Sequence, residues 1–206
     1  MDAIIDLFTK GGIYIFPLIL CSIFGLAIFL QKLQLLQRKK LLPEEFLSSL
    51  YETVETKGLE EAKSLSASND SAVAKMALAA AQNSGKSKEE MHEAIEAAGK
   101  NEAQGLEKYI ETLLTISSIS TLIGLLGTIS GMIKVFAVIS EKDIVDPPSL
   151  AGGISEALYT TALGLTIAIP ALIAYKYTDG KFKEIISELE DEGKKILETF
   201  SAKASL

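Results

Sequence analysis

The sequence has few of the residues on which most chemical sites are built. Among 206 residues there is one cysteine, one histidine and no tryptophan. A single cysteine, Cys21, excludes a disulfide framework and a cysteine-based zinc site, and we interpret it as an ordinary apolar residue. One histidine, His92, cannot build a metal cluster, and its charged neighbours indicate a solvated helix position. The sequence therefore predicts no metal site and no cofactor.

Signatures of enzymes and of nucleic-acid binding are missing as well. The sequence contains no GxGxxG, GKS/GKT, HExxH or GxSxG string, so it offers no case for an enzyme. The formal net charge is −7, and no basic patch with interleaved aromatic residues occurs. This balance argues against a nucleic-acid partner.

Charged residues are absent from three long stretches of the chain. Residues 11–31, 112–133 and 157–175 contain no Asp, Glu, Lys, Arg or His over 21, 22 and 19 positions. Because a bilayer core requires a helix of about 20 apolar residues, three such stretches predict a polytopic membrane protein. The first stretch is longer than the apolar part of a signal peptide, and neither a basic segment before it nor an A-x-A site after it is present. We therefore interpret it as a retained transmembrane helix.

The basic residues near the membrane ends predict the orientation and the layout of the chain. Those that follow the first and third spans (Lys32, Arg38, Lys39, Lys40, Lys176, Lys181 and Lys183) outnumber those on the other side (Lys10, Lys134 and Lys142). By the positive-inside rule, the N-terminus and the loop between spans two and three lie outside. The predicted segments are the outer N-terminus and first span (1–31), a cytoplasmic helical insert (32–111), the second span (112–139), an outer, periplasmic loop (140–149), the third span (150–175) and a cytoplasmic amphipathic C-terminal helix (176–206). The fold class is thus an all-α polytopic membrane protein, whose three transmembrane helices are joined by long helices to a cytoplasmic helical bundle.

Helix signals continue through the segments outside the spans. Gly58 is a plausible helix stop, and residues 87–90 (Ser-Lys-Glu-Glu) match a capping box. No proline follows before residue 147, so one helix is predicted from about Lys88 to Ile139. In the C-terminal segment, apolar residues recur at helical spacing between Phe182 and Phe200. This stripe requires a cover, which is either the chain's own cytoplasmic helices or a separate partner.

The second span is rich in small and hydroxyl-bearing residues. Eight of the 22 residues in its charge-free part, 112–133, are Ser or Thr. Thr121, Gly124, Thr128 and Gly131 share one helical face, Gly127 and Gly131 form a GxxxG pair, and the third span adds Thr160, Thr161 and Gly164. Small residues let membrane helices approach closely, so the glycines at 124, 127, 131 and 164 predict helix packing and oligomerisation through these two spans. Helix packing alone and a polar path through the membrane are both compatible with the pattern.

Two opposite charges are predicted to lie inside the membrane. If the third span begins near Leu150, Glu156 lies about six residues, or roughly 9 Å, within it. An intramembrane carboxylate indicates an ion or proton site, and the alternative is an interfacial glutamate at the helix mouth. Lys134 lies at a similar depth in the second span, so we expect it to pair with Glu156 within one subunit or across a ring. The alternative is that Lys134 extends outward to the lipid headgroups.

Two motifs resemble the paired signature of the MotA/TolQ/ExbB proton-channel family. They are GLLGTISGMI at 124–133 and SEALYTTALGLTIAIPALIAY at 155–175. The order of three spans around a large insert also fits, and GGIYIFPLILCSIFGLAIFLQKL at 11–33 resembles the first ExbB helix. The resemblance covers nearly the whole chain, although residues 32–111 match only in length and helical character. ExbB and TolQ are closer than flagellar MotA, which has four spans and a longer chain.

The resemblance implies a complex of the bacterial inner membrane. Five such subunits would surround two copies of a single-span, ExbD- or TolR-like partner that carries an intramembrane aspartate. The complex would use the proton motive force to energise a TonB- or TolA-like protein that spans the periplasm. The family's pore residues map onto Thr128, Thr161 and Glu156, whereas Lys134 stands where family members often carry a neutral residue. Hydroxyl groups do not titrate near neutral pH, so an acidic residue of the partner would complete a path that otherwise contains only Glu156.

Several alternatives stay open at this point. Thr161 lies about 140° from Glu156 on an ideal helix, whereas Thr160 lies on the same side as Glu156, so Glu156 and Thr161 need not face one lumen. A non-conducting scaffold for a cytoplasmic bundle is the main competing function, and it predicts full function when Thr128, Thr161 and Glu156 are made apolar. A flagellar-type stator subunit is disfavoured by the number of spans. The residues are compatible with either H⁺ or Na⁺ as the ion.

Overall fold

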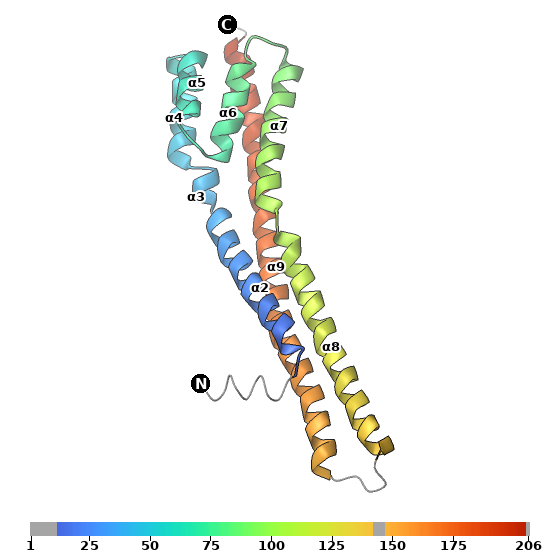
Figure 1. Cartoon of the computed structure of the whole chain (residues 1–206). Coiled ribbons are helices and arrows are strands. Elements are labelled where there is room, and N and C mark those ends of the chain that lie inside the picture. Colours follow the sequence, from blue (N-terminus) through green and yellow to red (C-terminus); the bar gives the residue numbers. More distant parts are fainter. Residues whose placement is uncertain (1–11, 142–146, 205–206) are drawn as a thin grey trace. The chain divides into compact units, whose positions relative to one another are not determined.

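A computed structural model describes residues 12–141 and 147–204, and helix is the regular structure found in these ranges. The helices, labelled as in Figure 1, are α2 (Ile15–Leu35), α3 (Arg38–Leu41), α4 (Glu44–Thr56), α5 (Leu59–Ala67), α6 (Ala72–Gln82), α7 (Lys88–Glu107), α8 (Ile110–Glu141) and α9 (Pro147–Ala204). The chain divides into two compact units. Unit 1 comprises the chain up to Gln31 and Tyr109–Tyr177, and unit 2 comprises Lys32–Lys108 and the chain from Thr178 onward. The helices α2 and α9 contribute to both units.

Three helical stretches are long and apolar enough to cross a membrane. They are Ile15–Leu35, Lys88–Ser140 and Leu150–Ala204. Two of the three charge-free windows of the sequence fall inside these stretches, and the first window overlaps α2. The predicted all-α polytopic class is thereby confirmed, while the orientation in the membrane and the segment boundaries stay predictions.

Unit 2 is held together by large apolar side chains. Buried side chains come from α4 (Phe46, Leu50, Val54), α7 (Met91, Ile95) and α9 (Ile185, Leu189, Ile196, Phe200). The C-terminal part of α9 lies beside α6 and α7, where Gly193 faces Met76 and Ile95 (Figure 1). The Tyr51 hydroxyl also donates a hydrogen bond to Glu192 at 2.8 Å. The apolar stripe of the C-terminal segment is therefore covered by the chain's own helices.

The capping box at the start of α7 is confirmed. The Glu90 N–H donates to the Ser87 hydroxyl at 3.2 Å, and the Ser87 N–H donates to Glu90 Oε2 at 3.1 Å. These reciprocal bonds satisfy two of the N–H groups that every helix leaves unpaired at its first turn. The bonds from the Ser87 N–H and hydroxyl lower the pKa of the Glu90 carboxyl below its ordinary value.

The predicted continuous helix from Lys88 to Ile139 is wrong. The helix α7 ends at Glu107 and α8 begins at Ile110, and Tyr109 between them has a φ of 70°. A residue in the left-handed region cannot continue a right-handed helix. The Leu106 carbonyl near the end of α7 accepts a hydrogen bond from Lys32 Nζ at 2.7 Å, and Lys32 is only 1% exposed. A buried cation from α2 therefore stabilises the C-terminal end of α7, where the helix dipole favours positive charge.

Candidate ion pathway

In unit 1, α8 and α9 pack against each other through glycine. A Cβ added to Gly131 would lie 2.6 Å from the Ala157 Cβ, and one added to Gly164 would lie 2.6 Å from the Ser120 carbonyl oxygen. A Cβ added to Gly124 would lie 3.2 Å from the Thr161 Cα, and one added to Gly127 would meet the Thr160 side chain. Such distances leave no space for a side chain, so the two backbones are in close contact. All four predicted packing glycines thus lie at a contact within one chain. The part of these glycines in oligomerisation stays a prediction, and the space beside each of them is occupied by atoms of the same chain.

Lys134 of α8 and Glu156 of α9 form an ion pair within the chain. Lys134 Nζ lies 2.6 Å from Glu156 Oε1, a length typical of a charge-assisted hydrogen bond. The Glu156 side chain is 25% exposed and the Lys134 side chain is 57% exposed. The contact expected from the equal depth of the two residues is therefore present, and its role in ion passage stays a prediction.

Thr128 and Thr161 form a second contact between the same two helices. Their Oγ atoms lie 3.1 Å apart, Thr161 Oγ lies 2.8 Å from the Gly124 carbonyl, and Thr128 Oγ lies 2.8 Å from the Leu125 carbonyl. Each hydroxyl has one proton to donate. Either Thr128 donates to Thr161, which donates to Gly124, or Thr161 donates to Thr128, which donates to Leu125. The two hydroxyl protons of the pair can therefore be arranged in two ways, and a role of this pair in proton transfer stays a prediction.

The ion pair and the threonine pair are separate sites along α9. Five residues separate Glu156 from Thr161, which corresponds to about 7.5 Å along a helix axis. Thr160, on the same side of α9 as Glu156, is 1% exposed, and its hydroxyl donates to carbonyls of its own helix at Glu156 and Ala157. Thr160 is thus a packing residue, and a proton that moved between Glu156 and Thr161 would need an intervening water or side chain.

Sequence reasoning missed three residues of this region. The Ser117 hydroxyl donates to the Ala168 carbonyl at 2.8 Å and so joins α8 to α9. The buried Ser120 hydroxyl has no hydrogen-bond partner among the residues that the structure describes. Gly12, in the turn before α2, lies against the carboxylate of Glu156. The abundance of hydroxyl residues in the second span was visible in the sequence, but no sequence signal separates Ser117 and Ser120 from their neighbours. Gly12 is 144 positions from Glu156, and no local pattern links the two.

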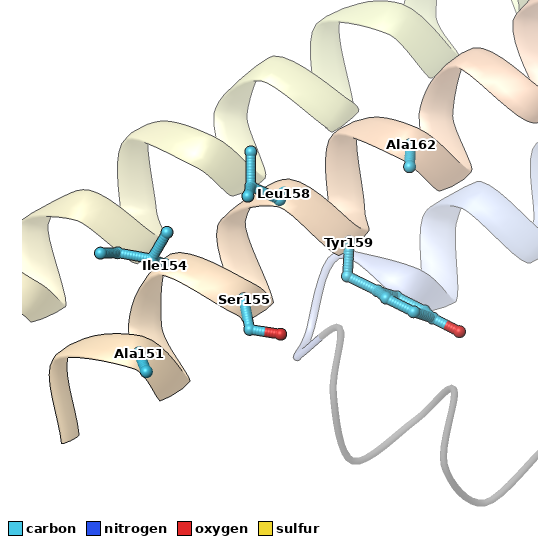
Figure 2. Close-up of a pocket in the computed structure, with 6 residues that line it drawn as sticks. All are labelled: Ala151, Ile154, Ser155, Leu158, Tyr159 and Ala162. Carbon is cyan, nitrogen blue, oxygen red and sulfur yellow. The ribbon is translucent and has the colours of Figure 1, made fainter. Parts of the chain in front are cut away.

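A shallow hollow lies on α9 beside Glu156. It has a volume of about 600 Å³ and is lined by Ala151, Ile154, Ser155, Leu158, Tyr159 and Ala162. Figure 2 shows these six side chains on successive turns of α9. The lining is mostly apolar and, among the described residues, comes from this one helix. Its chemistry suits contact with lipid or with another apolar helix better than the binding of a polar ligand.

The geometry of the α8–α9 contact indicates a class of membrane protein. Three helices are long and apolar enough to cross a membrane, and the contact between the second and the third carries a charge pair and a hydroxyl pair, a combination that favours an ion site in a membrane protein. The model of the MotA/TolQ/ExbB proton channel family matches residues 65–191, and this chain belongs to that family. The matched region contains all of the site residues predicted from the sequence.

Individual relatives agree with this assignment. The chain is 26% identical over 188 residues to a putative biopolymer transport protein ExbB homolog of Methanothermobacter thermautotrophicus, covering 91% of this chain and 67% of the relative. It is 40% identical over 82 residues to the Tol-Pal system protein TolQ of Haemophilus influenzae, covering 40% of this chain and 36% of the relative. Its fold is similar to a chain in the solved structure of C. jejuni MotAB, with a TM-score of 0.63, 20% identity, and coverage of 94% of this chain and 78% of that chain.

Proposed function

We propose that this chain is the ion-channel subunit of an inner-membrane complex that uses the proton motive force to energise a TonB- or Tol-type partner spanning the periplasm. The observation that carries the proposal is the carboxylate of Glu156 within the third apolar helix, on the same pair of helices as the Thr128–Thr161 hydroxyl pair. A charge in a membrane helix is costly, so its presence favours a function. An exchangeable pair of hydroxyl protons is not required for helix packing, which the glycines already provide.

In this proposal Lys134 balances the charge of the Glu156 carboxylate within the membrane. Removing one partner of an ion pair within the membrane would leave the other charge uncompensated, so each residue makes the other tolerable there. The transported cation would then compete with the lysine ammonium for the same carboxylate. The half-exposed position of Lys134 gives its ammonium room to withdraw.

The proposal includes further subunits. We propose a ring of five copies around two copies of a single-span, ExbD- or TolR-like partner, whose intramembrane aspartate supplies an acidic group near the gap of about 7.5 Å between Glu156 and Thr161. The exposed apolar side chains of α2, α8 and α9 would then face lipid or neighbouring copies. In the proposed orientation the N-terminus is periplasmic and the C-terminus is cytoplasmic. The protein acts without a cofactor or a catalytic residue.

The threonine pair provides the experiment. Thr128→Val and Thr161→Val keep the side-chain shape and remove the hydroxyls, and they are made in the chain co-expressed with a single-span, ExbD- or TolR-like partner. We expect each change to lower proton uptake into vesicles roughly tenfold, the effect of losing one hydrogen bond to a charged species at about 1.5 kcal/mol. Subunit assembly, measured by native mass spectrometry, should remain intact.

Thr166→Val is the matched control. Thr166 is an exposed residue of α9, and its hydroxyl donates to the Ala162 carbonyl of its own helix at 2.8 Å. Uptake should therefore match that of the wild type. If Thr128→Val and Thr161→Val also retain full uptake, the two threonines are packing residues and the non-conducting scaffold becomes the better explanation.

A further inference from the structure

The Glu156 carboxylate is enclosed from a direction that the family motifs do not include. Gly12 precedes α2 in the sequence, outside both signature motifs, and a Cβ built on Gly12 would meet Glu156 Oε1, with Glu156 Cδ 3.4 Å away. Oε1 is also the oxygen to which Lys134 Nζ donates at 2.6 Å. One carboxylate oxygen therefore lies between the ammonium of α8 and the backbone of the turn that leads into α2.

The position of Gly12 is fixed by the helix that follows it. The Ile15 N–H donates to the Gly12 carbonyl at 3.4 Å, and both Ile15 and Leu18 are fully buried. These anchors hold the first turn of α2 in unit 1, so the turn cannot readily move away from Glu156. Gly12 also has a φ of +61°, which glycine adopts without strain.

We infer that Gly12 is a positioning residue of the ion site, which keeps the Glu156 carboxylate in contact with Lys134 because it has no side chain. This inference rests on the proposed function, since it concerns the geometry of the same carboxylate. A methyl group at position 12 would occupy the space of Oε1. The carboxylate would then turn away, because the carboxylate is the movable end of a flexible side chain, whereas the backbone of the turn is anchored.

The test measures the Lys134–Glu156 contact directly and does not depend on transport. A membrane-permeant carbodiimide adds to the carboxyl group and activates it. The neighbouring amine then forms an amide with the activated carboxyl group, and the carbodiimide leaves as its urea. Applied to the full chain with its partner subunits in native membranes, it should join Lys134 to Glu156, and the linked peptide is quantified by mass spectrometry. We expect the link in the wild type because the two atoms are in contact.

Two variants at position 12 distinguish the effect of an added side chain from the effect of backbone strain. Gly12→Ala adds a Cβ and also strains the positive φ, whereas Gly12→Asn adds a Cβ in a residue that tolerates this region. Both should lower the yield of the link on the order of tenfold or more, because a displacement of about 1 Å between reacting groups has effects of this size. Gly12→Asn should accumulate in the membrane at the wild-type level.

Two glycines serve as matched controls. Gly58 has a φ of +98°, and no atom lies closer than 4.0 Å to the place that an added methyl group would take, so Gly58→Ala introduces strain alone. Gly152 lies near Glu156 in sequence, and none of the described residues comes within 4 Å of the same place, so Gly152→Ala introduces a methyl group alone. Both should keep the wild-type yield of the link.

The outcomes separate this inference from the proposed function. A wild-type yield in both Gly12 variants, the absence of the link in the wild type, or the failure of Gly12→Asn to accumulate would each overturn the positioning role. Loss of the link together with unchanged proton uptake would support the positioning role and contradict the proposed role of Glu156 in ion passage. Loss of both the link and the uptake supports both.

Discussion

The two units of the chain use opposite kinds of residue at their helix contacts. In unit 1, α8 and α9 meet at Gly124, Gly127, Gly131 and Gly164, where backbone approaches backbone. In unit 2, the contacts are made by large side chains such as Phe46, Leu50, Met91 and Phe200. Among the described residues, the exposed large apolar side chains belong to unit 1, except for Leu33 and Leu35 at the end of α2 in unit 2.

This difference follows from the solvent around each unit. In water, burial of apolar area is itself the driving force, at about 25 cal/mol per Å², so the large side chains turn inward. In lipid, apolar side chains gain little by leaving their surroundings, so helices associate where small residues permit close van der Waals contact. Residues at helical spacing therefore form the contact face in both units, but these residues are large in unit 2 and small in unit 1.

Truncation of a large side chain should produce the largest effect, and only in unit 2. Phe200 is fully buried, so we expect Phe200→Ala to lower the free energy of unfolding of unit 2 by about 3–5 kcal/mol. Phe136 of α8 is 62% exposed, and Phe136→Ala is the control in unit 1. Amide hydrogen exchange of the full chain in detergent measures the opening of each unit. Equal losses for the two variants would contradict the proposed difference in solvent.

Addition of one methyl group should have opposite signs in the two units. Gly164→Ala places a Cβ 2.6 Å from the Ser120 carbonyl oxygen and 3.0 Å from the Gly124 Cα, which are both backbone atoms. The helices must separate, and we expect a loss of about 1–3 kcal/mol in the stability of the α8–α9 pair. Gly180→Ala, also in α9, meets no atom of the described part of the chain within 4 Å and should gain up to about 1 kcal/mol from helix propensity. Hydrogen exchange in the two segments checks both signs, and a neutral Gly164→Ala would show that the contact can relax.

Much of the fold could be predicted because it depends on local patterns. Spans follow from charge-free windows, and the start of α7 follows from the Ser87 capping box. The break at Tyr109 could not be predicted, because no proline marks it and the nearby Gly105 lies inside α7. The contact that stabilises the end of α7 at this break is the hydrogen bond from Lys32 to the Leu106 carbonyl, and these two residues are 74 positions apart in the chain. Such a contact exists only once the helices are packed.

The candidate site was predictable to a similar extent. The Lys134–Glu156 contact was expected because a fixed helix rise places two residues at equal depth on antiparallel helices. The Thr128–Thr161 contact depends on the register of α8 against α9, which the glycine contacts determine, so the sequence did not predict it; the family resemblance indicated the two threonines only as pore residues. The approach of Gly12 to Glu156 depends on where the turn before α2 lies, and neither periodicity nor resemblance contains that information.

A smaller effect is expected from the ion pair that lies beside the glycine contact. Lys134→Met should weaken assembly by leaving the Glu156 carboxylate without its partner, and the addition of Glu156→Gln should restore assembly though not transport. Polar pairs between membrane helices have coupling energies on the order of 0.6 kcal/mol, so this double-mutant cycle requires replicate native mass measurements of the complex. Strictly additive losses would favour the alternative in which Lys134 interacts with headgroups.

The smallest effect concerns the capping box of α7 in unit 2, where a titratable side chain rather than packing fixes a helix end. The pKa of Glu90 is lowered from its ordinary value of 4.5, first by the hydrogen bond from the Ser87 N–H and then by the Ser87 hydroxyl. The folded chain therefore binds this proton less readily than the unfolded chain does. The stabilisation is present above the ordinary pKa and is lost as the pH falls through the lowered value.

Protection of the Ser87 amide against hydrogen exchange should report this loss. Corrected for the intrinsic exchange rate, protection should be constant near neutral pH and should fall at pH values below 4.5, as Glu90 takes up a proton and accepts less strongly from the Ser87 N–H. Glu90→Gln retains an acceptor at this position of the capping box but cannot titrate, so its protection should not change with pH in this range. Because the Glu90 side chain is exposed, the change should remain within the first turn of α7. A loss of protection that spread through unit 2 would show that the cap supports the packing of the bundle as well as the end of one helix.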